Sequence, residues 1–207
     1  MTRNPAAGVE KPGPRRRENP MTEEHYKKIV AGSRDQQWRD VVVFSWETGA
    51  RPQETVAIEA RHLDCDNERI VFPEEESKGK RFSRVIYLTP TALAIVKRLT
   101  KLHAKGVIFR NTDGIAWNGY STNCRFKRWE KRIGVKYCLY DIRHAWQNRL
   151  LKSGVDPMTL AVLAGHVDPS TFARWYQHLS RDSEYLRRAL KRSVNASDGI
   201  PKAEMLS

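Results

Sequence analysis

The fold is decided by a stretch near the amino terminus, residues 35–54, which reads DQQWRDVVVFSWETGARPQE. Its mostly apolar residues recur at the spacing of one helix face, which we assign to the core. These residues are Trp38, Val41, Val42, Ser45 and Trp46. Gly49 is expected to end this helix, and Pro52 to begin the next one. Arg51 therefore stands at a tight junction between two helices, where an arginine is rarely buried without a partner.

Further helices and one small sheet are expected outward from this stretch. Two β-branched segments, 69–72 and 84–88, flank the polar residues 74–82 and predict a β-hairpin with a basic tip. A short strand near 60–63 is expected to complete an antiparallel sheet. Helices are expected over residues 22–32, 90–99, 141–152, 158–164 and 183–192. The sequence thus predicts an α+β fold, mainly α-helical with a small three-stranded antiparallel sheet.

The two ends of the chain differ in composition from its middle. Residues 1–20 contain four prolines, two glycines and the run Arg15-Arg16-Arg17, which is the composition of a basic linker. Residues 194–207 are expected to form a disordered tail. Residues 21–193 are long enough for one domain with a substantial core. We expect a single folded domain between two extended ends.

The charge of the chain points to a polyanionic partner. The net charge is +13 and the pI is about 9.9, and a charge so far from zero favours partners such as nucleic acid. A generally solvated basic surface is the alternative. Residues 122–153 hold nine lysines and arginines against two acidic residues. We expect helices in this segment to contact phosphates, which positions a duplex without reading its sequence.

The cysteines and the lengths of the apolar runs indicate the cellular compartment of the protein. Cys65, Cys124 and Cys138 are odd in number and lack paired spacing, which argues against a disulfide framework and against a zinc site. No apolar run approaches the length of a membrane span. The sequence predicts a protein of the reducing cytoplasm with no membrane partner.

Four local patterns contain residues suited to attack on a phosphodiester. They are TGARPQE at 48–54, SKGK at 77–80, YDIRH at 140–144, and LAGH at 163–166 followed by RWYQHL at 174–179. Two arginines, a histidine and a tyrosine in this order suit an enzyme that attacks phosphorus with a phenol. Each pattern alone is weak, but the four occur in order on suitable elements.

Together the patterns resemble the catalytic domain of the tyrosine recombinases, the phage integrase family of site-specific DNA recombinases. The resemblance covers residues 21–193 and implies an enzyme that cleaves and rejoins double-stranded DNA through a covalent 3′-phosphotyrosine. It implies that Tyr176 is the nucleophile and that Arg51 and Arg143 clamp the non-bridging oxygens. It further implies that His166 donates a hydrogen bond and that Lys78 protonates the leaving oxygen. No metal or other cofactor is implied.

The sequence departs from the family pattern at Tyr140, where the family usually has a histidine. A phenol with a reference pKa near 10 is a poor base at neutral pH. Tyr140 is therefore expected to donate a hydrogen bond to phosphate or to orient Tyr176. His144 is a minor alternative for the missing histidine. On the hairpin, Lys80 competes with Lys78 for the role of general acid.

The resemblance also leaves alternatives at the level of the whole protein. Family members usually carry a core-binding domain before the catalytic domain, and residues 1–20 resemble the linker that would follow it. A synaptic tetramer on DNA is expected, with the last helix docking on a neighbouring subunit, in the nucleoid of a bacterium or a phage host. A catalytically impaired DNA-binding module and a type IB topoisomerase-like nicking-closing enzyme remain the alternative functions.

Overall fold

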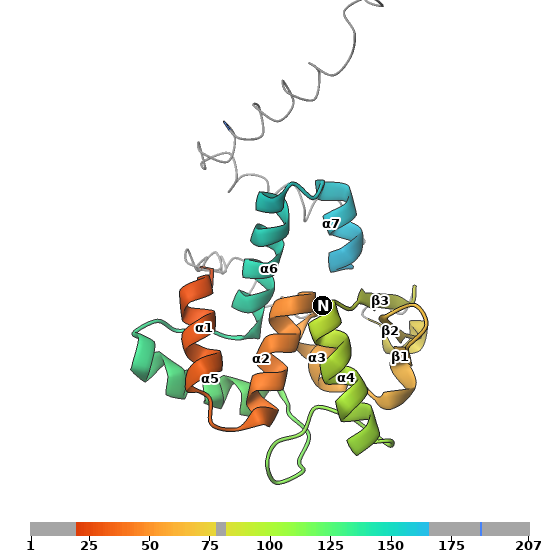
Figure 1. Ribbon diagram of the computed structural model, residues 1–207, viewed down its shortest axis with the longest axis horizontal. Coiled ribbons are helices and arrows are strands. Elements are labelled where there is room, and N and C mark those ends of the chain that lie inside the picture. The colour runs from red at the N-terminus through yellow and green to blue at the C-terminus, as the bar shows by residue number, and fades with distance from the viewer. Residues whose placement is uncertain (1–19, 78–81, 166–186, 188–207) are drawn as a thin grey trace, which may run out of the picture.

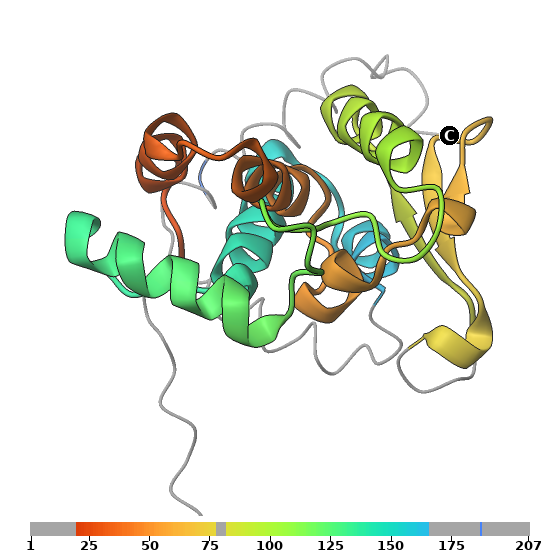
Figure 2. The same ribbon diagram turned by 90° about the horizontal axis from the view of Figure 1, so that it is seen from below.

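The computed structural model describes residues 20–77, 82–165 and 187, and it has the mainly helical α+β fold expected from the sequence (Figure 1). The described strands form one small antiparallel sheet at one end of the molecule, and helices occupy the rest (Figures 1 and 2). The helices are α1 (Glu23–Gly32), α2 (Gln36–Thr48), α3 (Pro52–Ala57), α4 (Pro90–Leu102), α5 (Gly119–Ile133), α6 (Leu139–Ser153) and α7 (Pro157–Ala164). The strands are β1 (Leu63–Asp64), β2 (Arg69–Phe72) and β3 (Arg84–Tyr87), with 3₁₀ turns at Ala60–His62 and Glu74–Glu76.

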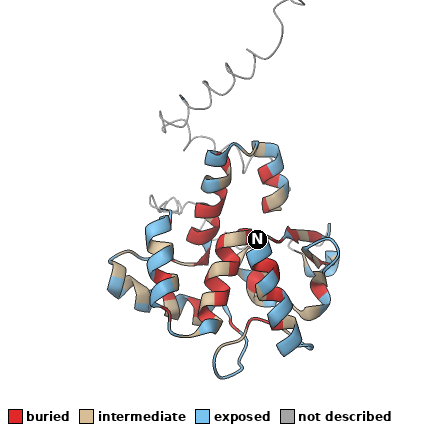
Figure 3. Ribbon diagram, viewed as in Figure 1, coloured by how far each residue is buried: buried red, intermediate tan, exposed pale blue. Residues whose placement is uncertain are grey.

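Helix α2 lies at the centre of the helical part and contacts α1, α3, α4 and α6. The Asp35 carboxylate caps its first turn by accepting a hydrogen bond from the backbone N–H of Trp38 at 2.6 Å. All five residues assigned to the core face are buried, which confirms that prediction (Figure 3). The Trp38 ring also meets Phe126 of α5 edge-on, with ring centroids 5.1 Å apart. Helix α2 therefore lies at the centre of the main core, and the second half of α6 packs with α7 in a second, smaller cluster of buried residues.

The turn after α2 requires glycine for two reasons. Gly49 has φ of 60°, in the left-handed region that other residues rarely adopt. A Cβ atom at this position would also lie 2.2 Å from the Trp146 ring of α6. As expected, Pro52 is the first residue of α3, and Arg51 is the N-cap residue between the two helices. The close packing of α6 on Gly49 fixes where Arg51 stands.

The sheet has the order β1-β2-β3 with antiparallel pairing throughout. Leu63 pairs with Ile70, and Ile70 pairs with Ile86 on the other side. Residues on β2 and β3 alternate in burial, so Ile70 and Ile86 face the core. The hairpin predicted from 69–72 and 84–88 is confirmed for the described residues.

The first strand differs from the prediction. Residues 60–62 form a 3₁₀ turn, and β1 begins at Leu63. His62 explains the shift, because its Nδ1 accepts a hydrogen bond from the backbone N–H of Glu59 at 3.1 Å. Its ring also packs on Phe72, with centroids 4.5 Å apart. These contacts close a turn where an extended strand was expected.

The remaining helix predictions hold where the structure describes the chain. Thr22 caps α1, and α6 ends at Ser153, one residue beyond the predicted end. Helix α6 begins at Leu139 rather than Asp141, because the Asp141 carboxylate accepts a hydrogen bond from the backbone N–H of Cys138 and so caps an earlier start. Tyr176, the predicted helix at 183–192 except for residue 187, residues 1–19 and the tail at 194–207 lie outside the described residues. No helix in the described part is long and apolar enough to cross a membrane.

Candidate active site

Three arginines that are far apart in the sequence meet at the carboxyl-terminal end of α7. Arg51 caps α3, Arg84 opens β3, and Arg143 lies in the second turn of α6. Helix α7 packs against both β3 and α6, which brings the three elements to the same place (Figure 1). The two arginines predicted to clamp phosphate, Arg51 and Arg143, are therefore neighbours, and Arg84 joins them.

Three successive carbonyl groups at the end of α7 each accept a hydrogen bond from a different arginine. The pairs are Arg84 with Leu163, Arg143 with Ala164 and Arg51 with Gly165, at N···O distances of 3.0, 2.6 and 2.5 Å. The last carbonyls of a helix have no partner within the helix and carry partial negative charge. The end of α7 thus holds the three guanidinium groups together.

Among the described residues, Glu54 supplies the carboxylate that pairs with this cluster. Its Oε1 accepts from Arg51 Nη1 at 2.5 Å and from Arg84 Nε at 3.2 Å, and its Oε2 accepts from the backbone N–H of Arg51. Burial alone would raise the pKa of Glu54, but the charges of Arg84 and Arg51 outweigh it and hold that pKa below its usual value. Three guanidinium groups against one carboxylate leave these four side chains with a formal charge of +2.

Arg143 is deeply buried for a charged residue. Its exposed fraction is only 3%. Its Nη1 donates to the carbonyl of Gly49 at 2.5 Å and its Nη2 to that of Ala164. Both carbonyls lie at helix ends. Because they accept hydrogen bonds from the guanidinium group, the Arg143 side chain can be buried. Burial, reinforced by the nearby charge of Arg51, lowers the pKa of Arg143 to about 10, so it remains a cation at neutral pH.

Sequence reasoning missed Arg84. Its side chain is 8% exposed and contacts the Glu54 carboxylate and the carbonyls of Val85 and Leu163. A signal was present, since Arg84 and Ile86 fall on the same face of a strand with period two. An arginine on the buried face of a strand needs a partner. The partners come from α3 and α7, which the strand pattern alone does not reveal.

Tyr140 lies in the first turn of α6, one turn before Arg143, and is 44% exposed. Its ring centroid is 6.3 Å from that of His144, the alternative histidine. Residues three and four apart share a face of a helix. Tyr140 is therefore a neighbour of both Arg143 and His144 on the surface of α6.

Lys78, Lys80, His166 and Tyr176 lie outside the described residues, but the structure describes their immediate neighbours. The Ser77 hydroxyl donates to the carbonyl of Phe82 at 2.6 Å, which joins the two ends of the segment that carries the lysines. Gly165, directly before His166, has φ of 66° and accepts from Arg51. Both flanking points are thus held in place.

The sequence model of the phage integrase family matches residues 19–182 of this chain. The chain belongs to the phage integrase family. The integrase of Salmonella phage P22 is 24% identical over 183 residues, covering 83% of this chain and 47% of that protein. Tyrosine recombinase XerA of Saccharolobus solfataricus is 25% identical over 171 residues, covering 81% and 55%. This family member spans about half the length of these relatives.

Solved structures of recombinases have the same fold. The crystal structure of XerA recombinase matches with a TM-score of 0.69 at 17% identity, covering 91% of this chain and 70% of that one. The Tn1549 transposon integrase in complex with circular intermediate DNA also matches with a TM-score of 0.69. The two are 19% identical, and the match covers 86% of this chain and 67% of that one. The expected tyrosine recombinase catalytic-domain fold is therefore confirmed for this family member.

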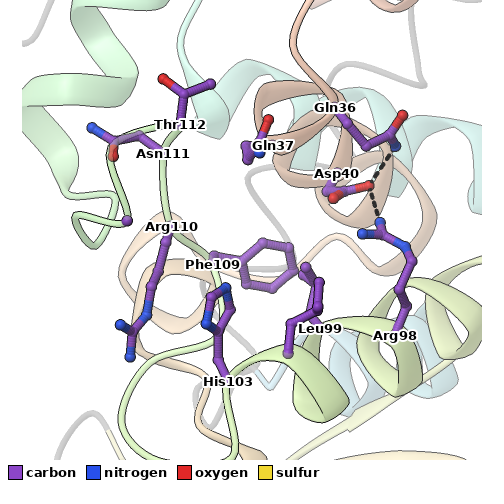
Figure 4. Close-up of a pocket in the computed structure, with 12 residues that line it drawn as sticks. Gln36, Gln37, Asp40, Arg98, Leu99, His103, Phe109, Arg110, Asn111 and Thr112 are labelled. Atoms are coloured by element: carbon purple, nitrogen blue, oxygen red, sulfur yellow. Dashed lines mark hydrogen bonds and ion pairs between the residues drawn. The ribbon is translucent and has the colours of Figure 1, made fainter.

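A separate pocket of about 290 Å³ lies between α2, the end of α4 and the loop around Asn111 (Figure 4). Its wall includes Asp40, whose Oδ1 accepts hydrogen bonds from Gln36 and Arg98. None of the arginines at the end of α7 lines it. Within the described ranges, no His, Cys, Asp and Glu side chains are grouped as metal ligands would be.

Proposed function

We propose that this chain is the catalytic part of a site-specific DNA recombinase that cleaves and rejoins double-stranded DNA through a 3′-phosphotyrosine. The observation that carries the proposal is the arginine cluster at the end of α7, directly before His166. The four described side chains of this cluster carry a formal charge of +2, which favours an anionic ligand. A phosphodiester supplies the required charge.

Arg51 and Arg143 take the role of the phosphate clamp. Phosphoryl transfer needs fixed positive charge at the non-bridging oxygens, and planar guanidinium groups meet two oxygens at once. The hydrogen bonds to Glu54, Gly49 and the end of α7 hold both groups before DNA arrives. Charges already in position cost no reorganisation during the reaction.

Chemistry at phosphorus follows from the four motifs. The Tyr176 oxygen attacks the scissile phosphate, a new O–P bond forms, and the bond from phosphorus to the 5′ oxygen breaks. Lys78 gives a proton to that leaving oxygen, with Lys80 as the alternative donor, and His166 donates a hydrogen bond to the phosphate. Tyr140 contributes a second hydrogen bond in place of the usual histidine. Because the covalent link retains the phosphodiester energy, the cycle needs no cofactor.

Helix α5 and the connection from α5 to α6 form the duplex-binding surface of the proposal. Lys127, Arg128, Lys131 and Lys136 are all exposed in this segment. Arg125 instead pairs with Asp35, so it is partly neutralised. Exposed lysines and arginines on one element suit sequence-independent phosphate contacts. The structurally similar Tn1549 integrase is in complex with circular intermediate DNA, which supports the choice of partner. We propose a synaptic tetramer on that DNA, in the cytoplasm.

Covalent trapping tests this function. Nicked duplexes that tile the DNA on either side of the gene lose a short fragment on cleavage, so a protein–DNA adduct accumulates. A slow band on a denaturing gel is expected for the unaltered chain and not for Tyr176→Phe. DNA binding without any adduct would favour the impaired DNA-binding module. Supercoil relaxation without joining of two sites would favour the topoisomerase-like activity.

A further inference from the structure

The buried Arg84 side chain connects its strand to two helices. Like Arg51 and Arg143, it links the 48–54 motif to the end of α7, in its case through Glu54 and Leu163. One guanidinium group therefore joins β3, α3 and α7. Its Nη2 is buried and has no hydrogen-bond partner among the described residues. A charge in this setting is costly, so an arginine here needs a reason beyond packing.

The Gly165 turn is built around the same side chain. A Cβ atom at Gly165 would lie 2.8 Å from Arg84 Cζ, Nε and Nη1. The guanidinium group thus lies directly against the residue that precedes His166. Gly165 in turn accepts the hydrogen bond from Arg51 Nη2. Arg84 consequently touches the support of Arg51 at two places, the Glu54 carboxylate and the Gly165 turn.

We propose that Arg84 is a positioning residue for phosphoryl transfer, which aligns Arg51 and the turn before His166 without contacting DNA itself. This inference rests on the proposed function. Arg84 Nη2 is buried, so the argument requires no contact between this side chain and the phosphate. Its effect passes through Glu54, which Arg84 and Arg51 share at Oε1, and through the carbonyl of Leu163.

Lysine cannot replace Arg84 in this role. The Nε of Arg84 serves Glu54 and its Nη1 serves Leu163, two acceptors on different elements. A guanidinium group holds several donors in a rigid plane, whereas an ammonium group is a single point on a flexible stem. Arg84→Lys is expected to keep the charge and lose one of the two links. Arg84→Met keeps most of the side-chain length and loses both hydrogen bonds, to Glu54 and to Leu163.

Single-turnover cleavage of the nicked duplex, at saturating protein, tests the inference. A misalignment near 1 Å costs roughly 100-fold in rate, so we expect Arg84→Met to cleave about 10- to 100-fold more slowly and Arg84→Lys to fall in between. The Kd for the same duplex should stay within about threefold, since a loss confined to the transition state leaves binding unchanged. A general loss of structure would weaken binding as well.

Arg98→Met is the matched control. Arg98 pairs with Asp40, whose side chain is 2% exposed, beside the separate pocket (Figure 4). This variant breaks an ion pair to a buried carboxylate away from α7. We expect it to lower the melting temperature and to keep the cleavage rate. If Arg84→Lys and Arg98→Met slow cleavage equally at equal melting temperatures, Arg84 has only a structural role.

A double variant tests the route through Glu54. If Arg84 acts through this carboxylate, Arg84→Lys with Glu54→Gln should be no slower than the slower single variant. Fully additive losses would overturn the shared route. If the unaltered chain forms no adduct, the proposed function fails and the role of Arg84 falls with it. If the unaltered chain cleaves and both Arg84 variants match it, only the inference about Arg84 fails.

Discussion

Arg143 donates a hydrogen bond to the carbonyl oxygen of Gly49 at 2.5 Å, although the two residues are 94 positions apart in the sequence. Trp146, one turn further along α6, lies against the same glycine and donates from Nε1 to the carbonyl of Glu47. Helix α6 therefore fixes the turn that presents Arg51. The helix that carries Arg143 thus also holds the turn that carries Arg51, so the positions of the two clamp arginines depend on each other.

The Gly49 turn should tolerate no side chain. Gly49→Ala places a Cβ at φ of 60° and within 2.2 Å of the Trp146 ring. We expect the free energy of unfolding to fall by about 1–2 kcal/mol because alanine is strained in the left-handed backbone conformation. Overpacking against Trp146 should lower it by about 1–3 kcal/mol more. Urea unfolding measures the sum. Gly114→Ala is the control, because Gly114 has φ of 75° with nothing within 4 Å and should show the first penalty alone. Equal losses in the two variants would contradict the packing account.

Arg143→Lys should abolish most cleavage while sparing DNA binding. Lysine cannot serve both Gly49 and Ala164, and the loss of one preorganised donor slows such reactions by about 10²–10³-fold. Adduct formation over time gives the rate, and a salt titration gives the affinity. Arg110→Lys is the matched control and should keep the cleavage rate, because Arg110 also donates to two backbone carbonyls but lies outside the cluster. A full rate in Arg143→Lys would remove this residue from the clamp.

Inorganic phosphate should stabilise the protein in the absence of DNA. An anion that relieves the excess charge of the cluster binds the folded state alone and adds about 2.7 kcal/mol at one hundred times its Kd. Melting temperature against phosphate concentration, at constant ionic strength with sodium chloride, measures this effect. Arg51→Ala should lose most of the increase. Arg69→Ala, which breaks the ion pair with Asp64 in the sheet, should keep it. An identical response in both variants would mean that phosphate binds elsewhere.

Stability in acid should depend on Glu54. Its folded pKa lies below the usual 4.5, so the ionised form adds stability above pH 4.5 that is lost as the pH falls through the folded value. Unfolding free energy should therefore decline more steeply below pH 4.5 in the unaltered chain than in Glu54→Gln. Glu75→Gln changes an exposed carboxylate and should keep the original slope. Parallel curves for all three proteins would show that Glu54 is not coupled to the arginines.

Local signals predicted the helices well. Thr22 and Asp35 are polar caps followed by periodic apolar residues, and Gly49 ends α2 as predicted. Gly154 and Gly165 cap α6 and α7 within two residues of the predicted helix ends. These cues act within a few residues of the chain, which is why they are visible without a structure. Arg51 at its junction was predictable for the same reason.

Distant contacts were not predictable in this way. Arg84 is buried because Glu54 and Leu163 reach it from other elements, and Arg143 is buried because Gly49 and Ala164 do. Neither set of partners is near in sequence. A side-chain contact between His62 and Phe72 likewise replaced an expected strand with a turn. The roles of Lys78, Tyr140, His166 and Tyr176 remain predictions.

The attachment point of the DNA tests the central claim most directly. The trapped adduct should be digested with nuclease and trypsin, and the peptide that retains a nucleotide identified by mass spectrometry. Cleavage after Arg174 and Arg181 isolates Tyr176 in residues 175–181, whereas Tyr140 falls in residues 137–143. A nucleotide on residues 175–181, lost in Tyr176→Phe, is the predicted result. A nucleotide on residues 137–143, or an adduct that persists in Tyr176→Phe, would contradict the account.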